Sequence, residues 1–76
     1  MKKRSVKIAG HSTSVSLEDE FWTALQALAV AEDSSLKALI TRIDDNRKGE
    51  NLSSALRLYV LRHLQAQLNS LQSNPA

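Results

Sequence analysis

The sequence predicts a mostly α-helical domain with one short N-terminal strand, completed as a homodimer. The chain has 76 residues, enough for one compact unit but for only a small core of its own. One segment alternates between apolar and polar residues as a strand does, and three later segments repeat apolar residues at helical spacing. Cysteine is absent, so no disulfide stabilises the fold, and a partner subunit is the expected source of further burial.

Composition argues against several classes of protein, namely disordered, membrane-spanning and secreted proteins and enzymes. Apolar residues make up 42% and charged residues 24%, which is typical of a folded chain. No apolar run approaches the roughly 20 residues of a membrane-spanning helix, and the N-terminal segment lacks the apolar region of a signal peptide, so we expect a cytoplasmic protein. With no cysteine, two histidines and no glycine-rich phosphate loop or paired-histidine motif, the sequence predicts no enzyme, no metal site and no cofactor.

Residues 5–17 form the strand region, and Gly10 divides it at a bend or bulge. No two-residue turn sequence such as Asn-Gly joins two strands of comparable length, so a hairpin within one chain is not indicated. We therefore expect the strand to pair antiparallel with the same strand of a second copy, because a single molecule would leave it unpaired. Beyond Gly10, the inward positions are Thr13, Val15 and Leu17, and the outward positions are Ser12, Ser14 and Ser16.

Three helices follow the strand. Acidic residues open the first helix, expected near residues 18–32, where they complement the helix dipole. Asp33 to Ser35 supply turn and N-cap side chains for a second helix that ends near Asp45. A third helix continues to about Leu68 or Leu71. The predicted dimer core, drawn from the strand and all three helices, comprises Val15, Leu17, Phe21, Trp22, Leu25, Leu39, Ile40, Leu56, Tyr59 and Val60.

The third helix carries apolar residues on more than one narrow stripe, so we expect it to contact neighbours on two sides. This pattern favours a homodimer or a tetramer, and it also fits a protein partner bound through the third helix. The expected division of the chain is a basic N-terminal arm or first strand segment over residues 1–9, a domain over residues 10–71 and a disordered tail over residues 72–76.

Charge is unevenly distributed along the chain. The formal net charge is only +2, but four basic residues and no acidic residue fall within the first eleven positions. A basic arm of this kind can contact DNA phosphates, although a short basic run can also serve as a solubilising tail. The four basic residues are Lys2, Lys3, Arg4 and Lys7.

The serine-rich segments offer candidate DNA contacts. A two-stranded ribbon fits the major groove, where the hydroxyl groups of Ser12, Ser14 and Ser16 can contact base edges. Unpaired backbone amides at the start of the second helix, around Ser34 and Ser35, can hold a phosphate. Each feature also has an ordinary structural explanation, as solvent-facing serines on a strand and as a helix N-cap.

Two strings of residues resemble a subgroup of short bacterial ribbon-helix-helix proteins. They are Gly-His-x-Thr-Ser, from Gly10, and Asn-Leu-Ser-Ser-Ala-Leu-Arg, from Asn51, and the resemblance extends over residues 10–61. It implies that two chains intertwine, that their strands form a ribbon that enters the major groove, and that the start of the second helix touches a phosphate. By position, it puts Ser12, Ser14 and Ser16 on the groove side and Ser34 and Ser35 at the phosphate contact.

The chain departs from the family pattern in three respects. Serines stand on the groove face where the family often has Arg, Lys, Asn or Gln, the turn between the helices lacks its usual glycine, and a third helix follows. Asp33 can take the left-handed conformation that glycine would supply in that turn. Members of the family commonly act as transcriptional repressors or antitoxins, so the resemblance implies a dimeric, sequence-specific regulator bound to double-stranded DNA. The alternative is an interaction or oligomerisation module on the same scaffold that binds no DNA.

Overall fold

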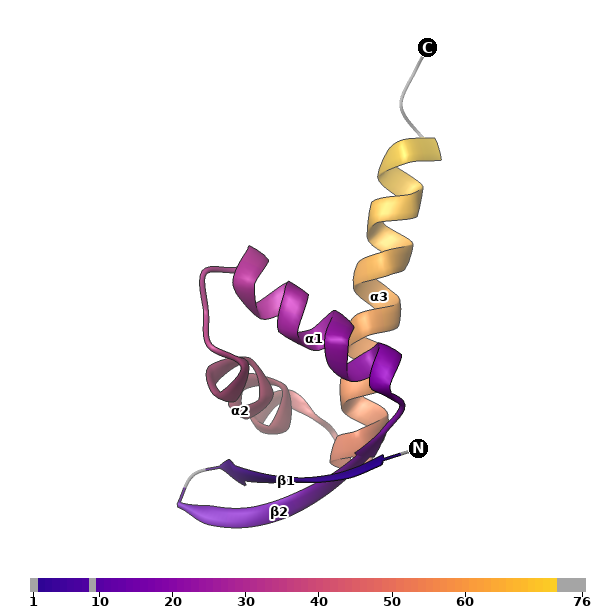
Figure 1. Cartoon of the computed structure of the whole chain (residues 1–76). Coiled ribbons are helices and arrows are strands. Elements are labelled where there is room, and N and C mark those ends of the chain that lie inside the picture. Colours follow the sequence, from indigo (N-terminus) through magenta and orange to yellow (C-terminus); the bar gives the residue numbers. More distant parts are fainter. Residues whose placement is uncertain (1, 9, 73–76) are drawn as a thin grey trace.

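The computed structural model describes residues 2–8 and 10–72, which form a two-stranded antiparallel sheet followed by three helices. Helices α1 and α2 cover one face of the sheet, and α3 starts beside the sheet and projects beyond the other helices (Figure 1). The elements in chain order are β1 (Lys2–Ile8), β2 (His11–Leu17), α1 (Asp19–Ala31), α2 (Leu36–Asn46) and α3 (Leu52–Gln72). The three helices therefore lie where apolar spacing and capping residues predict them, with ends that differ by one to a few residues.

The prediction of a single strand was wrong, because residues 2–8 form a strand that pairs with β2 in the same chain. Lys2 lies opposite Leu17 at one end of the hairpin, and Ile8 lies opposite His11 at the other. Gly10, between the strands, has a φ angle of +84°, which is a conformation that tight hairpin turns require. Gly10 thus belongs to a turn and not to a bend within one strand. Pairing of β2 with a second copy stays a prediction, but β1 already supplies the neighbour that a lone strand would lack.

The core closes within one chain. Helices α1 and α2 pack on the inner face of the hairpin, and α3 packs against both helices and against β2. Of the residues predicted to form a dimer core, Phe21, Trp22 and Tyr59 are partly buried. The others are fully or almost fully buried without a partner subunit: Val15, Leu17, Leu25, Leu39, Ile40, Leu56 and Val60.

The connection between α1 and α2 is a tight turn. Asp33 has a φ angle of +56°, which confirms that this aspartate adopts the left-handed conformation usual for glycine. The Ser34 N–H donates to the carbonyl oxygen of Ala29 at 2.8 Å, which satisfies a carbonyl group at the end of α1. Helix α2 then begins with Ser35 as its N-cap, whose Oγ accepts from the Ala38 N–H at 3.0 Å. These local bonds set the direction in which α2 leaves α1.

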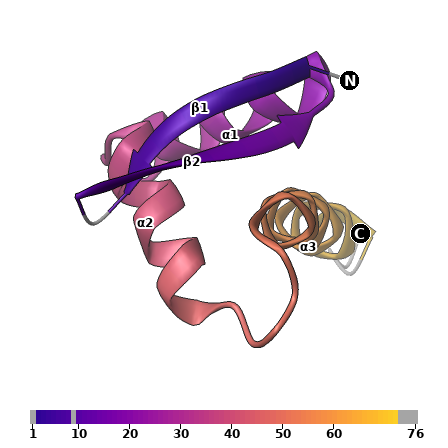
Figure 2. The same ribbon diagram turned by 90° about the horizontal axis from the view of Figure 1, so that it is seen from below.

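Helix α3 continues to Gln72, the first residue of the predicted tail, and residues 73–76 lie outside the described residues. Figure 2 views α3 nearly end-on and shows the hairpin running across α1, with its turn near the start of α2. Within residues 2–8 and 10–72, no helix is both long enough and apolar enough to cross a membrane.

Candidate functional site

Within the paired residues 2–8 and 11–17, the side of the hairpin that faces away from the helices carries only polar residues. Strand residues alternate between the two faces, so directly opposite partners share a face. Five of the residues on this side are exposed and Ser16 is half-buried, and none is acidic. We call this surface the outer face, and it consists of the opposite pairs Lys3 and Ser16, Ser5 and Ser14, and Lys7 and Ser12.

The three serines predicted as base contacts, Ser12, Ser14 and Ser16, all project from β2 onto the outer face. Sequence reasoning missed Ser5, which adds a fourth hydroxyl group on β1. The signal was present, because residues 3–8 alternate between polar or charged and apolar residues once Arg4 is assigned to the inner side.

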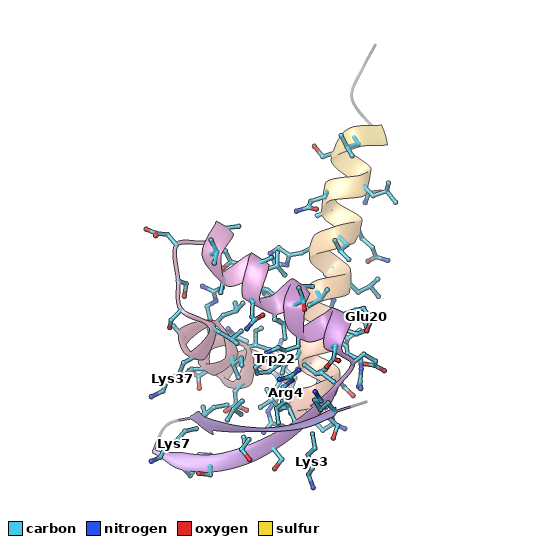
Figure 3. All side chains as sticks on the ribbon, viewed as in Figure 1. Lys3, Arg4, Lys7, Glu20, Trp22 and Lys37 are labelled. Atoms are coloured by element: carbon cyan, nitrogen blue, oxygen red, sulfur yellow. The ribbon has the colours of Figure 1, made fainter. Side chains whose placement is uncertain are left out.

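Of the four basic residues predicted as phosphate contacts, Lys3 and Lys7 belong to the outer face. Lys3 extends away from the helices, and Lys7 lies near the hairpin turn (Figure 3). Lys2 is exposed at the opposite end of the hairpin, where it shares a shallow pocket with Glu18, Asp19 and Glu20. Lys2 therefore lies beside the acidic start of α1, and the outer face holds two of the four predicted cations.

Arg4 lies on the helix side of the hairpin. Its guanidinium donates from Nη2 to Oδ1 of Asp19 at 3.0 Å and lies 4.6 Å from the centre of the Trp22 ring (Figure 3). A cation over an aromatic face is attracted by the ring quadrupole, and the carboxylate adds an ion pair. Arg4, predicted as part of a basic arm, thus joins β1 to α1 on the side of the hairpin opposite to the outer face.

The start of α2 lies beside β1. Leu36 and Lys37 line a mainly apolar cleft of about 220 Å³ together with Ser5 to Ile8 of β1. Ser35 caps α2, and the Ser34 hydroxyl donates to the carbonyl oxygen of Ser35 at 3.2 Å. The two serines predicted as phosphate contacts therefore directly precede the residues of α2 that line this cleft. Lys37, which sequence reasoning did not select, is exposed on the same flank (Figure 3).

Helix α3 holds the other end of the hairpin. The Ser16 N–H donates to Oγ of Ser53 at 3.0 Å, and the Arg57 guanidinium donates to the Ser16 carbonyl oxygen at 2.9 Å. Arg57 also donates from Nε to Oε1 of Glu18 at 3.1 Å. The pKa of Glu18 is lowered mainly by a backbone hydrogen bond and, to a smaller extent, by the hydrogen bond from Arg57. These contacts fix the outer face relative to the helical body.

Comparison with models of known protein families matches residues 1–64 to the ribbon-helix-helix domain. The chain belongs to the ribbon-helix-helix family. Searches of curated proteins and of solved structures gave no significant match. Ribbon-helix-helix domains are generally DNA-binding transcription regulators without enzymatic activity, and they typically form dimers that bind DNA. The match ends inside α3, so the last two turns of that helix lie beyond the family domain.

A second polar cluster in this ribbon-helix-helix chain joins the end of α1 to α2 and α3. Glu32 accepts hydrogen bonds from the Tyr59 hydroxyl and from the Arg42 guanidinium, which lower the pKa of Glu32, with Tyr59 contributing more. The pKa of Tyr59 is raised mainly by burial and, to a smaller extent, by the hydrogen bond to Glu32. The His63 ring lies 4.2 Å from the Tyr59 ring. Since the members of the cluster are bonded to one another across three helices, we assign it a structural role.

Proposed function

We propose that this ribbon-helix-helix protein is a dimeric, sequence-specific double-stranded DNA-binding protein that regulates transcription. The observation that carries the proposal is the outer face, where one hairpin presents four serines and two lysines without an acidic residue. A two-stranded ribbon fits the major groove, and family membership supports the same function. We place the regulator in the cytoplasm of a bacterium, where DNA is directly accessible to it.

In this proposal Ser12, Ser14 and Ser16 contact base edges. Alternate residues of a strand are about 6.8 Å apart, which is roughly twice the spacing between successive base pairs. Successive hydroxyl groups along β2 can therefore contact about every second base pair. Because a hydroxyl group can donate or accept, serines discriminate between bases less strongly than bidentate Arg or Asn side chains, and we expect modest sequence preference.

Lys3 and Lys7 are the proposed phosphate contacts of the hairpin. A second proposed phosphate contact lies at the start of α2, just after Ser34 and Ser35, where the first backbone amides of the helix and the exposed Lys37 side chain flank β1. Arg4 is engaged with Asp19 and Trp22, so we assign it to the stability of the fold.

The proposed regulator is a homodimer, as is typical of the family. In the described part of the chain, β1 has a strand neighbour on one side only, and an apolar cleft lined by Trp22 and Ile40 lies along its edge. A second copy that covers this edge would bury apolar surface and would place two outer faces on one duplex.

Salt dependence of duplex binding tests the phosphate contacts. If Lys3, Lys7 and Lys37 of both subunits neutralise about six phosphates, the logarithm of affinity should fall against the logarithm of salt concentration with a slope of about −5.4. Lys3→Ala should reduce the slope to about −3.6, because two lysines per dimer are lost. Lys48→Ala, which removes an exposed lysine between α2 and α3, is the matched control and should leave the slope unchanged.

Selection from a randomised duplex pool tests the base contacts. Ser12→Ala combined with Ser14→Ala should relax the selected sequence while leaving binding to unrelated duplexes unchanged, whereas Lys3→Ala should weaken all duplexes alike. If the two kinds of variant behave alike, the assignment of roles is wrong. Absence of duplex binding even at low salt would remove the proposed function. The exposed leucines of α3 would then favour the alternative, an interaction module on this scaffold.

A further inference from the structure

The C-terminal half of α3 exposes a row of leucines. Leu61, Leu64, Leu68 and Leu71 are 46%, 53%, 53% and 76% exposed, respectively. The buried residues of α3, among them Leu56 and Val60, lie in its first half, which packs on the body (Figure 1). Among the described residues, no other element covers the projecting half. Four large apolar side chains on one short segment exceed the scattered exposure that is normal for a protein surface.

These leucines share one face of the helix. They are spaced by three, four and three residues, which is the pattern of the inward positions of a two-stranded coiled coil. The spacing is also symmetric about residue 66, so a two-fold axis through that point brings leucine opposite leucine. We call Leu61, Leu64, Leu68 and Leu71 the leucine stripe.

The surroundings of the leucine stripe suit contact with an identical helix. Gln65 and Gln67 flank the stripe and carry no charge, and Arg62 is the one Lys, Arg, Asp or Glu residue between Leu61 and Leu71. Two identical charged surfaces would repel each other, whereas two neutral ones do not. The charge pattern therefore favours a second copy of this chain over a strongly acidic or basic partner.

We propose that α3 pairs antiparallel with α3 of a second copy through the leucine stripe. In this arrangement, Leu61 packs against the partner's Leu71, and Leu64 packs against the partner's Leu68. The orientation follows from Arg57, which lies one turn before Leu61 on the same helix face and binds Ser16 and Glu18. A parallel pair would push the two hairpin ends held by these contacts against each other, whereas an antiparallel pair keeps the two bodies apart.

The pairing has a consequence for DNA binding that rests on the proposed function. The outer face lies at the end of the molecule opposite the projecting half of α3 (Figure 1). An antiparallel pair of α3 helices therefore turns two outer faces away from each other. One assembly can then hold two separate duplexes, and it becomes a tetramer if each end is itself a dimer.

Solution mass without DNA tests the pairing independently of DNA binding. Leu64→Glu combined with Leu68→Glu should halve the mass of the assembly and weaken association at least about a hundredfold, because each pair would bury four unpaired charges. Val30→Glu is the matched control, since Val30 is 78% exposed on α1 and lies off the leucine stripe; it should leave the mass unchanged. Helical circular dichroism should be the same in all three proteins. An unchanged mass in the double variant, or a monomeric parent protein, overturns the proposal.

Disulfide cross-linking tests the orientation, because the chain has no cysteine of its own. Leu61→Cys and Leu71→Cys proteins of different tagged lengths should form a disulfide when mixed and oxidised, and neither should form one alone. Residues 61 of two antiparallel chains would lie about 15 Å apart along the axis, too far for a disulfide. A cross-link in either protein alone overturns the antiparallel arrangement, and no cross-link in the mixture overturns the pairing.

Co-capture of two duplexes tests the consequence. An immobilised duplex should retain a second, labelled duplex in the presence of the parent protein. The Leu64→Glu and Leu68→Glu double variant should bind each duplex but lose co-capture. If neither protein binds DNA, the proposed function fails while the mass and cross-linking results still decide the pairing. Equal co-capture by the parent and the double variant overturns the role of the leucine stripe.

Discussion

Neighbouring basic residues of β1 have different roles because strand side chains alternate between faces. Lys3 points outward, where its charge is available to a phosphate, and Arg4 points inward to Asp19 and Trp22. A count of basic residues in the first eleven positions gives the net charge of the segment but not the face on which each charge lies. The hairpin register makes that assignment and separates the outward-facing Lys3 from Arg4, which contacts Asp19 and Trp22.

Arg4 and Lys3 should therefore respond differently to substitution. Arg4→Ala should lower the free energy of unfolding by about 1–2 kcal/mol, because the ion pair, the aromatic contact and the packing of the side-chain stem are lost together. Lys3→Ala should change it by less than about 0.5 kcal/mol, as is usual for an exposed side chain. Urea denaturation measures both values, and a larger loss for Lys3→Ala would contradict the assignment.

The lowered pKa of Glu32 predicts a pH-dependent stability. Tyr59 and Arg42 stabilise the carboxylate in the folded state, so the unfolded chain binds more protons than the folded chain between the folded and the unfolded pKa. The stabilisation is fully present above the unfolded pKa, near pH 4–5, and is lost as the pH falls through the folded pKa. The urea midpoint should fall over that range. Glu32→Gln should lower the midpoint at pH 7 and flatten its decline in acid, and a decline as steep as in the parent would rule out this contribution.

The turn that ends α1 depends on the backbone conformation of one residue, Asp33. Asp33 occupies a left-handed position at the end of α1 that favours glycine, since a side chain there costs about 1 kcal/mol. Asp33→Gly should thus raise the free energy of unfolding by about 0.5–1 kcal/mol, as measured by thermal or urea unfolding. Asp33→Ala retains the Cβ atom and should give no gain. If the two substitutions changed the free energy of unfolding equally, backbone strain at Asp33 would not limit the stability of the fold.

The elements differed in how well the sequence predicted them. Each helix was located to within a few residues, because capping groups such as Ser35 and apolar spacing are local properties. The hairpin was missed because its turn lacks the Asn-Gly or Asp-Gly signal, although Gly10 does have a positive φ angle. The outward position of Ser12, Ser14 and Ser16 was nonetheless predicted, because alternation along β2 does not depend on which strand lies beside it.

At the scale of the whole molecule, the short sequence predicted that a partner subunit would add to the buried core, and a single chain already buries a core of its own. Among residues 2–8 and 10–72, twelve apolar residues from all five elements form one buried cluster. A two-stranded antiparallel surface also forms within one chain, from β1 and β2. Association is then free to occur at other surfaces, such as the leucine stripe.

The folded state should consequently survive loss of association. The Leu64→Glu and Leu68→Glu double variant should still unfold cooperatively, and its midpoint should depend less on protein concentration than that of the parent, because the association through the leucine stripe is lost while the core of each chain is retained. Urea unfolding followed by circular dichroism measures this directly. A non-cooperative transition in the double variant would instead show that the core needs the copy bound at the leucine stripe.

The sequence by itself determined the helices, the alternation along β2, the basic character of the first residues and the family resemblance, because each depends on residues close together in the chain. Tertiary structure decided that residues 2–8 pair with residues 11–17. It also decided that Lys3 lies on the same face as the serines, that Arg4 contacts Trp22, and that α3 projects beyond the other helices. These features depend on which segments meet in space. Register and packing set that outcome, and no local pattern encodes it alone.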